Sequence, residues 1–477
     1  MCAQKPNVLF ISVDDLRPQL GCYGDELIKS PNIDRLAEEG VVFNRAYCQM
    51  PICMASRSSI MSGERPDRNQ LYTNGPLSSL NPDVLTLNQH FQNNGYKTVG
   101  LGKIYHHKSD IEQGWSQEFF WPWPDEGEWE DYGYETKWYG RGYMDEENKK
   151  TARHHDKTQT GRRGMGPAYE AADMPDSLYK DGIIAEQALK ELRKLKDEQF
   201  FLAVGFIKPH LPFVAPQKYW DMYDENEIEL ADNPFAPKDV PGEAVTDWDE
   251  LRAYYGMPDE GQMPDSLSRK LIHGYNACVS FTDALVGRLL DELEELGLRE
   301  NTIVVLWGDH GWKLGEHGMW CKHTNFELDA RVPLIISAPG MKAKGQKTQA
   351  LTELVDVYPT LSELCNLEQP EHLQGKSMVP LLNTPDLKWK DAVFTQYPSD
   401  GHPWRRQKNN PPEVMGYSMR TDQFRYTEWI KTEDNSVIAR ELYNHITDPD
   451  ENINVAEKPE YTTIVVSLSE KLHADKN

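Results

Sequence analysis

The 477-residue sequence lacks several patterns that mark specialised classes of protein. No apolar run approaches the ~20 residues that a membrane-spanning helix needs, so we expect no membrane span. The seven cysteines are odd in number and include no Cys-x-x-Cys pair, which excludes a disulfide scaffold and a zinc ribbon. No Asn-x-Ser/Thr sequon occurs, which argues against a eukaryotic secretory glycoprotein.

Positive charge is also scarce. Lys and Arg total 51 against 76 Asp and Glu, which gives a formal net charge of -25. A chain this acidic repels polyanions at long range, so we expect no nucleic-acid partner. Cations that bind an anionic substrate must then be gathered in a local pocket, which favours a small ligand or a chain end over the middle of a charged polymer.

What the sequence does contain is a regular alternation of apolar and amphipathic segments. Strands are predicted at residues 8–13, 41–47, 96–101, 200–207, 302–307 and 332–337, and helices at 32–39, 85–94, 177–197, 267–296 and 352–365. This order is typical of an α/β fold in which a large, mostly parallel sheet lies between helices.

Two regions depart from the alternation. Residues 111–175 are rich in Trp, Tyr, Gly and acids without a clear period, and are interpreted as a long insertion. After residue 386, strands are predicted at 391–397, 415–420, 423–430 and 441–443, followed by a helix at 462–473. We therefore predict an N-terminal α/β domain over residues 1–385 and a small C-terminal α+β subdomain with an antiparallel sheet over residues 386–477.

Acidic residues follow two of the predicted strands. Asp14 and Asp15 come directly after strand 8–13, and Asp309 and His310 come just after strand 302–307. Ligands of open α/β sheets lie beyond the carboxyl ends of the strands, and crowded carboxylates usually share a cation. Either pair alone is better explained as a turn cap, whereas both together favour a metal site. Oxygen-rich ligation indicates Ca²⁺ or Mg²⁺, and the His leaves the identity open.

A cysteine precedes a short predicted helix. Cys53 is followed four residues later by Arg57, in the stretch Cys53-Met54-Ala55-Ser56-Arg57. This spacing places a nucleophile beside backbone N–H groups and a guanidinium, which suits a tetrahedral oxyanion. An isolated thiol is as often a buried structural residue, and the spacing leaves both interpretations open.

Cationic side chains follow the other strand ends. Each taken singly is typical of solvated surface, but acids, a thiol, Arg, Lys and His at four strand ends together indicate a functional site. The residues concerned are Lys103 and His106 after strand 96–101, Lys208 and His210 after strand 200–207, and Lys322, which lies thirteen residues after Asp309.

These motifs, in matching order over nearly the whole chain, resemble the formylglycine-dependent sulfatases, in particular the iduronate-2-sulfatase branch and the bacterial uronate 2-O-sulfatases. The resemblance implies an alkaline-phosphatase-like fold. The residues that carry it include Val13-Asp14-Asp15-Leu16-Arg17-Pro18, Gly102-Lys103-Ile104-Tyr105-His106, Lys208-Pro209-His210-Leu211-Pro212-Phe213, Gly308-Asp309-His310-Gly311-Trp312, Gly416-Tyr417-Ser418-Met419-Arg420 and Glu441-Leu442-Tyr443.

The sulfatase signature is Cys or Ser, any residue, Pro or Ala, any residue, then Arg. Cys53 and Arg57 match it, with Ala55 where Pro is usual. The resemblance implies that a formylglycine-generating maturation enzyme oxidises Cys53 to formylglycine, whose hydrate is the nucleophile. It also implies one divalent cation, usually Ca²⁺ with Mg²⁺ as the alternative, held by the set Asp14, Asp15, Cys53, Asp309 and His310.

The resemblance implies a role for each cation as well. Arg57, Lys103 and Lys322 would bind and neutralise the sulfate. His210 is our first choice as the acid that protonates the leaving sugar oxygen, with Lys322 as the alternative, and His106 is the candidate base.

The implied substrate is a sulfated oligosaccharide of the heparan, heparin or chondroitin type that carries a 2-O-sulfated uronic acid at its non-reducing end. The ring carboxylate needs donors, for which Lys208, Arg405 and Arg406 are candidates. The alternatives are a sulfatase of another carbohydrate position, a phosphomonoester or phosphonate hydrolase of the same superfamily, or a sugar-binding protein with a dead site. We expect an exported protein, with the bacterial periplasm as first choice of compartment and the lysosome as the alternative.

Overall fold

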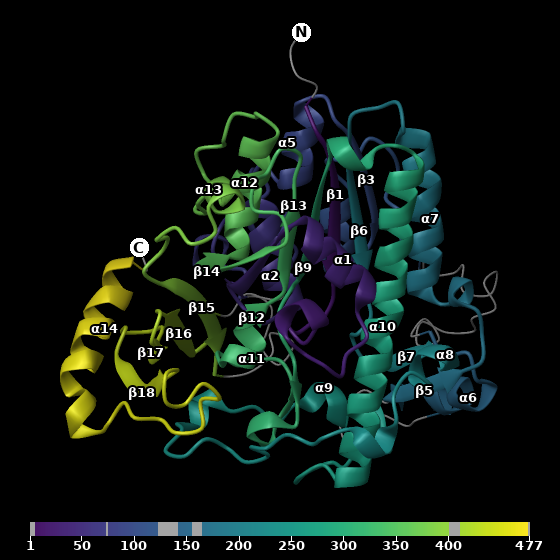
Figure 1. Ribbon diagram of the computed structural model, residues 1–477. Helices are drawn as coiled ribbons and strands as arrows, with labels where there is room; N and C mark the ends of the chain where they lie inside the picture. Colours follow the sequence, from purple (N-terminus) through teal and green to yellow (C-terminus); the bar gives the residue numbers. More distant parts are fainter. Residues whose placement is uncertain (1–4, 73–74, 123–141, 155–164, 400–410, 476–477) are drawn as a thin grey trace.

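The computed structural model describes residues 5–72, 75–122, 142–154, 165–399 and 411–475. Its centre is an eight-stranded sheet with the order β12-β2-β13-β9-β1-β6-β3, and β14 pairs with β2 (Figure 1). Only β12 and β13 run antiparallel to their neighbours, so the prediction of a mostly parallel sheet is confirmed. The strands are β1 Asn7–Val13, β2 Val41–Tyr47, β3 Lys97–Gly102, β6 Phe200–Phe206, β9 Thr302–Gly308, β12 Arg331–Val332, β13 Leu334–Ser337 and β14 Gln346–Glu353.

Helices cover both faces of this sheet, because the strands are apolar on both sides. In β1, Leu9 and Ile11 pack into one core cluster, whereas Val8 and Phe10 pack into the other. The first cluster is covered by α1 Pro31–Glu39, α7 Lys180–Leu195 and α10 Asp265–Glu295, and the second by α2 Cys53–Ser62, α5 Leu87–Asn93, α12 Val357–Leu364 and α13 Val379–Asn383. Adjacent side chains of a strand point to opposite faces, so each central strand contributes to both cores.

Two predicted boundaries differ from the structure. The helix predicted at 352–365 begins only at Val357, because Thr352 and Glu353 still pair with Ala46 and Tyr47 as the end of β14. The single strand predicted at 332–337 is divided at Pro333, whose ring nitrogen has no hydrogen to donate to a sheet. Neither difference moves the carboxyl edge of the sheet.

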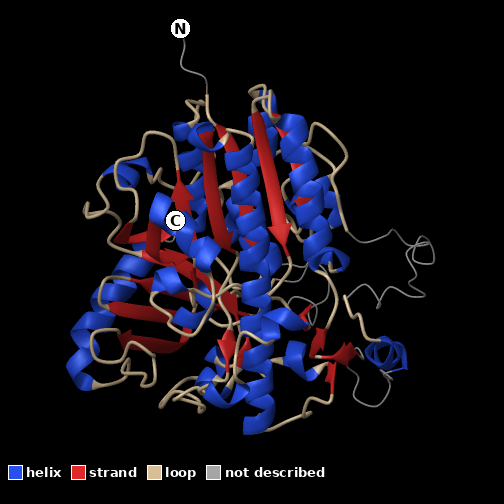
Figure 2. Ribbon diagram, turned by 45° about the vertical axis from the view of Figure 1, so that its right-hand side comes forward, coloured by secondary structure: helices blue, strands red, loops and turns tan. Residues whose placement is uncertain are grey.

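A second, antiparallel sheet follows in the order β15-β16-β17-β18, as predicted for the C-terminal part. Figure 2 shows it beside the large sheet. Leu472 of the last helix packs with Met419 and Tyr426 of this sheet, in a hydrophobic cluster that is separate from the two clusters of the large sheet. The elements are β15 Val393–Pro398, β16 Val414–Arg420, β17 Phe424–Lys431, β18 Val437–Asn444 and α14 Thr462–Asp475.

The long insertion is described only in part, because residues 123–141 and 155–164 lie outside the described residues. Its described segments include α6 Glu146–His154, β4 Met165–Pro167 and β5 Tyr169–Ala172. β4 pairs with the two-residue strand β8 Tyr254–Tyr255, and β5 pairs with the four-residue strand β7 Phe213–Pro216. Among the described helices, none is long and apolar enough to cross a membrane.

Candidate active site

Four neighbouring parallel strands end at one edge of the large sheet. In the order β9, β1, β6 and β3 they share a register, with Val13 of β1 level with Phe206 and Gly308. Eight of the predicted site residues follow these ends: Asp309 and His310 after β9, Asp14 and Asp15 after β1, Lys208 and His210 after β6, and Lys103 and His106 after β3. The sheet thus gathers residues from four distant parts of the sequence.

Two glycines allow β3 and β6 to end in close contact. Gly102 has a φ of 69°, and a Cβ at Gly205 would lie 2.2 Å from the carbonyl of Lys103. Ser12 Oγ donates to the carbonyl oxygen of Lys103 at 2.9 Å, which ties the turn after β3 to β1. Glycine at both positions therefore lets Lys103 sit directly beside the end of β1.

The acidic residues are held by hydrogen bonds from buried neighbours. Asp15 has a φ of 58°, a left-handed conformation that costs energy outside glycine. Its backbone N–H donates to Asp309 Oδ1 at 3.0 Å, and its carbonyl accepts from Tyr275 Oη at 2.9 Å. These contacts fix the turn and keep the carboxylates of Asp14, Asp15 and Asp309 in one buried cluster.

Cys53 is the first residue of α2 and is buried at the same edge. Its Sγ lies 3.3 Å from His310 Nε2 and 3.8 Å from Asp15 Oδ1. Burial, and then the charge of Asp14, raise the pKa of the thiol well above its ordinary value. These surroundings favour the thiol form of Cys53 over the thiolate.

The acids, the thiol and the histidines form two overlapping groups of metal-ligand atoms. One contains Asp14, Asp15, Cys53 and His210, the other Cys53, Asp309 and His310, and within each group the candidate ligand atoms lie within 4.8 Å of one another. A carbonyl can only accept, so Nδ1 of His310 carries the proton in its 3.0 Å contact with Gly311 O and Nε2 faces the cluster. The structure thus brings together all five residues predicted to hold a metal.

Two cations are paired with this cluster from the sheet side. Arg57 is fully buried. Its Nε lies 2.9 Å from Asp309 Oδ2, and its Nη2 lies 3.0 Å from Asp14 Oδ1. Lys103 Nζ donates to Asp14 Oδ2. Burial alone raises the pKa of Asp14, but Lys103 and Arg57 outweigh it and hold that pKa well below the ordinary value, so Asp14 is ionised.

A further acid lies between Lys322 and His210, and the sequence did not reveal it. Glu250 Oε2 is 2.9 Å from Lys322 Nζ, and its Oε1 is 3.2 Å from His210 Nε2. Lys322 also contacts Asp15 Oδ2 at 3.0 Å. Burial lowers the pKa of Lys322, but Asp15 and Glu250 more than offset this and raise it well above the ordinary value. Glu250 follows no predicted strand and belongs to no motif, so no sequence signal singled it out.

The remaining predicted residues lie in different settings. His106 is half-buried; its Nδ1 is enclosed without a hydrogen-bond partner, and no hydrogen bond joins it to Cys53 among the described residues. Burial, then the nearby Lys103, lower the pKa of His106 well below its ordinary value. Lys208 Nζ donates to the carbonyls of His210 and Pro212 at 2.5 Å each. Arg405 and Arg406 lie outside the described residues.

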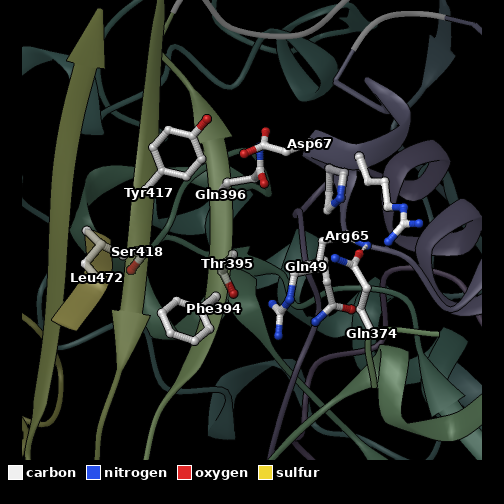
Figure 3. A pocket seen from close by; sticks show the side chains of 12 residues that line it. Gln49, Arg65, Asp67, Gln374, Phe394, Thr395, Gln396, Tyr417, Ser418 and Leu472 are labelled. Carbon is white, nitrogen blue, oxygen red and sulfur yellow. Dashed lines mark hydrogen bonds between the residues drawn. The ribbon is translucent and has the colours of Figure 1, made fainter. Parts of the chain in front are cut away.

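A separate cavity of ≈ 320 Å³ lies between residues 65–68 and the C-terminal sheet (Figure 3). In it, Gln396 of β15 donates to Asp67 at 2.8 Å, and the guanidinium of Arg65 lies 5.3 Å from the ring centre of Phe394. Its lining contains none of the predicted catalytic residues. The lining residues are Gln49, Arg65, Pro66, Asp67, Arg68, Gln374, Phe394, Thr395, Gln396, Tyr417, Ser418 and Leu472.

Both the N-terminal and the C-terminal part of the chain match known protein families. Residues 6–367 match the Sulfatase family, and residues 315–477 match the family described as N-sulphoglucosamine sulphohydrolase, C-terminal. The chain is 33% identical to iduronate 2-sulfatase of Mus musculus, covering 97% of this chain and 93% of that protein. It is 31% identical to a sulfatase of Formosa agariphila, covering 97% and 85% of the two chains.

Solved structures show the same fold at lower identity. A structure in complex with its substrate D-glucosamine-2-N,6-O-disulfate has a TM-score of 0.73 at 23% identity and covers 99% of this chain and 97% of that chain. Phosphonate monoester hydrolase of Agrobacterium radiobacter has a TM-score of 0.76 at 22% identity, with 99% and 95% covered. A 2-O GAG sulfatase has a TM-score of 0.72 at 22% identity, with 99% and 93% covered. The alkaline-phosphatase-like fold is thereby confirmed.

Proposed function

The chain belongs to the sulfatase family, a family of enzymes that hydrolyse sulfate esters, and we propose that it removes the 2-O-sulfate from the non-reducing-end uronic acid of heparan-, heparin- or chondroitin-type oligosaccharides. The observation that carries this proposal is the identity of 33% over nearly the full length of proteins named iduronate 2-sulfatase. By the same likeness we propose an exported enzyme, with the periplasm as its compartment.

The donor set fits a divalent cation. Asp14, Asp15 and Asp309 supply hard carboxylate oxygens, and His310 Nε2 completes a buried set that suits Ca²⁺ or Mg²⁺. When bound, such a cation supplies positive charge to the sulfate oxygens and to the nucleophile. Buried carboxylates repel each other; Arg57, Lys103 and Lys322 contact these three aspartates, and a bound cation would add positive charge at the same place.

We propose that Cys53 is oxidised to formylglycine by a formylglycine-generating enzyme, which supplies a hydrated aldehyde in place of the thiol. The position of Cys53 in the signature Cys53-Met54-Ala55-Ser56-Arg57, within a chain that matches the Sulfatase family, supports this. The position at the start of α2 turns backbone N–H groups toward an anion bound there.

Arg57, Lys103 and Lys322 are proposed to neutralise and align the sulfate. His210 is the proposed proton donor to the sugar oxygen: its Nδ1 contacts Leu211 O at 2.6 Å, so the proton for the sugar would come from Nε2, which contacts Glu250 Oε1 at 3.2 Å in this structure. The strongly raised pKa of Lys322 favours His210 over Lys322 as acid, because a proton held that tightly is transferred slowly. His106, kept neutral by its lowered pKa, is the proposed base.

The test offers disaccharides sulfated singly at uronate 2-O, glucosamine 6-O or glucosamine N, and measures sulfate release. We expect release from the uronate 2-O-sulfate, and a sharp loss when the uronate carboxylate is reduced to an alcohol, because the candidate donors Lys208, Arg405 and Arg406 then lose a charged acceptor. Cys53→Ala is the matched control for contaminating sulfatases. Preference for a glucosamine position, or indifference to carboxyl reduction, overturns the uronate assignment. Faster release of phosphate from a matched phosphomonoester favours the hydrolase alternative.

A further inference from the structure

Glu250 brings a fourth carboxylate to the proposed sulfate site. It lies in α9 Asp249–Arg252, a helix of one turn, and its two oxygens reach Lys322 Nζ at 2.9 Å and His210 Nε2 at 3.2 Å. A carboxylate here repels a sulfate ester, so by itself it weakens substrate binding. Its two oxygens contact Lys322 and His210, so its effect on the site is exerted through these two side chains.

The surrounding segment is built to hold this carboxylate in place. Trp248, which precedes the helix, has a φ of 43°, and the guanidinium of Arg252 lies 3.4 Å from the centre of its ring. Arg252 also donates to the carbonyls of Asp247, Pro258 and Gly261 at 3.1, 2.8 and 2.7 Å. Leu251 is fully buried. One arginine therefore fixes both sides of the short helix, and the strained entry to it is held by packing.

We propose that Glu250 is a positioning residue that orients His210 and Lys322 for protonation of the leaving sugar oxygen. The proposal rests on the role of His210 given above and extends it. Leu211 O accepts from one ring nitrogen of His210 at 2.6 Å, and Glu250 contacts the other, so the two contacts define the plane of the ring. The second oxygen of Glu250 holds Lys322 against Asp15.

The expected consequence is a loss in kcat with little change in KM. Arg57 and Lys103, two of the three cations proposed for the sulfate, pair with Asp14 and not with Glu250, so they remain in place when Glu250 is replaced. Proton transfer to the leaving oxygen depends on the ring orientation, and general acids contribute typically ~10²–10⁴-fold. We therefore expect Glu250→Gln to lower kcat by about 10²-fold and to change KM by less than about 3-fold.

The matched control is Glu260→Gln, because Glu260 is an exposed acid of the same segment. It removes the same charge at a site away from His210 and should leave both parameters unchanged. Rates are normalised to folded protein that carries the modified residue 53. Glu250→Ala serves as the second variant, with the same expectation, so that a folding defect in one does not decide the result.

A double-mutant cycle separates positioning from a general structural role. If Glu250 acts through His210, Glu250→Gln should lower kcat by less than about 3-fold when His210 has already been replaced by Ala, because the side chain that Glu250 orients is then absent. The proposal is overturned if the fold-losses in kcat of the two single variants multiply in the double variant, or if kcat of Glu250→Gln alone lies within about 3-fold of the parent. The cycle uses whichever sulfate ester the parent enzyme hydrolyses fastest, so it stays decisive even if the uronate 2-O assignment fails on the disaccharide panel.

Discussion

Arg57 Nε lies 2.9 Å from Asp309 Oδ2, and neither side chain is exposed to solvent. The same guanidinium reaches Asp14 Oδ1 at 3.0 Å, so one arginine joins the ends of β1 and β9. Burial lowers the pKa of Arg57, but Asp309 and Asp14 raise it more, so the charge is permanent. Arg57 is thus both a structural link across the sheet edge and one of the cations of the proposed sulfate site.

The double role of Arg57 predicts that its loss reduces stability as well as activity. Arg57→Leu leaves two enclosed carboxylates without their partner, and breaking a buried pair in this way costs roughly 3–5 kcal/mol. We expect a lower free energy of unfolding in denaturant titrations and a fall in kcat/KM of at least about 10²-fold. Arg35→Leu, which removes an exposed pair with Asp291, is the control. Unchanged stability of Arg57→Leu would contradict the structural role.

Activity should follow the fraction of Cys53 that is converted to the aldehyde. The physical reason is that a thiol has no carbonyl carbon to hydrate, so only the aldehyde can form the geminal diol that the proposed attack requires. Peptide mass spectrometry across residue 53 gives the converted fraction, and sulfate release gives the rate. Cys53→Ala should be inactive. Protein with a fully unmodified thiol that turns over as fast as converted protein would exclude the mechanism.

Metal removal should lower both activity and melting temperature. Asp14, Asp15 and Asp309 are buried together, so a cation that binds only the folded state stabilises it by mass action. Chelation should lower Tm, and added Ca²⁺ should restore it, whereas Asp309→Ala should show the same loss and no response to Ca²⁺. Elemental analysis confirms removal. Full activity of the stripped protein would remove the aspartates and His310 from a metal site.

Lys208 is expected to act on the loop that carries His210. Its ammonium is buried and donates to the carbonyls of His210 and Pro212 at 2.5 Å each. Lys208→Met leaves both carbonyls without this donor, so we expect a lower Tm and a lower kcat with KM within about 3-fold. If Lys208 instead binds the uronate carboxylate, the variant will show a raised KM that carboxyl reduction of the substrate abolishes.

The sequence was most informative where chemistry follows a strong strand signal. Asp14, His210 and Asp309 could be assigned to one edge because parallel strands deliver their carboxyl ends together. Glu250 could not be found in this way: it lies on a helix of one turn, among many acids, and only tertiary folding brings it to Lys322. The predicted start of α12 was wrong for a similar reason: pairing with β2, a tertiary contact, extends β14 to Glu353.

The C-terminal sheet offers a pH test that is independent of the active site. Glu441 is buried, and accepts from Trp429 Nε1 at 2.8 Å and from Tyr443 Oη at 2.7 Å. Burial raises its pKa from 4.5 to about 7, although those two hydrogen bonds lower it. Between pH 4.5 and about 7, Glu441 is protonated in the folded state but ionised in the unfolded state. Its contribution to stability is therefore fully present below pH 4.5 and is lost as the pH rises to about 7.

Glu441→Gln removes the ionisation and should remove this pH dependence. A shift of this size corresponds to roughly 3 kcal/mol, so the variant should gain stability relative to the parent at pH 8 and little or none near pH 4.5. The measurement is the free energy of unfolding of both proteins across this range, with Glu413→Gln as the control because Glu413 is exposed. A difference between variant and parent that is the same at both ends of the range would show that Glu441 ionises normally, and that its hydrogen bonds with Trp429 and Tyr443 stabilise the carboxylate enough to offset burial.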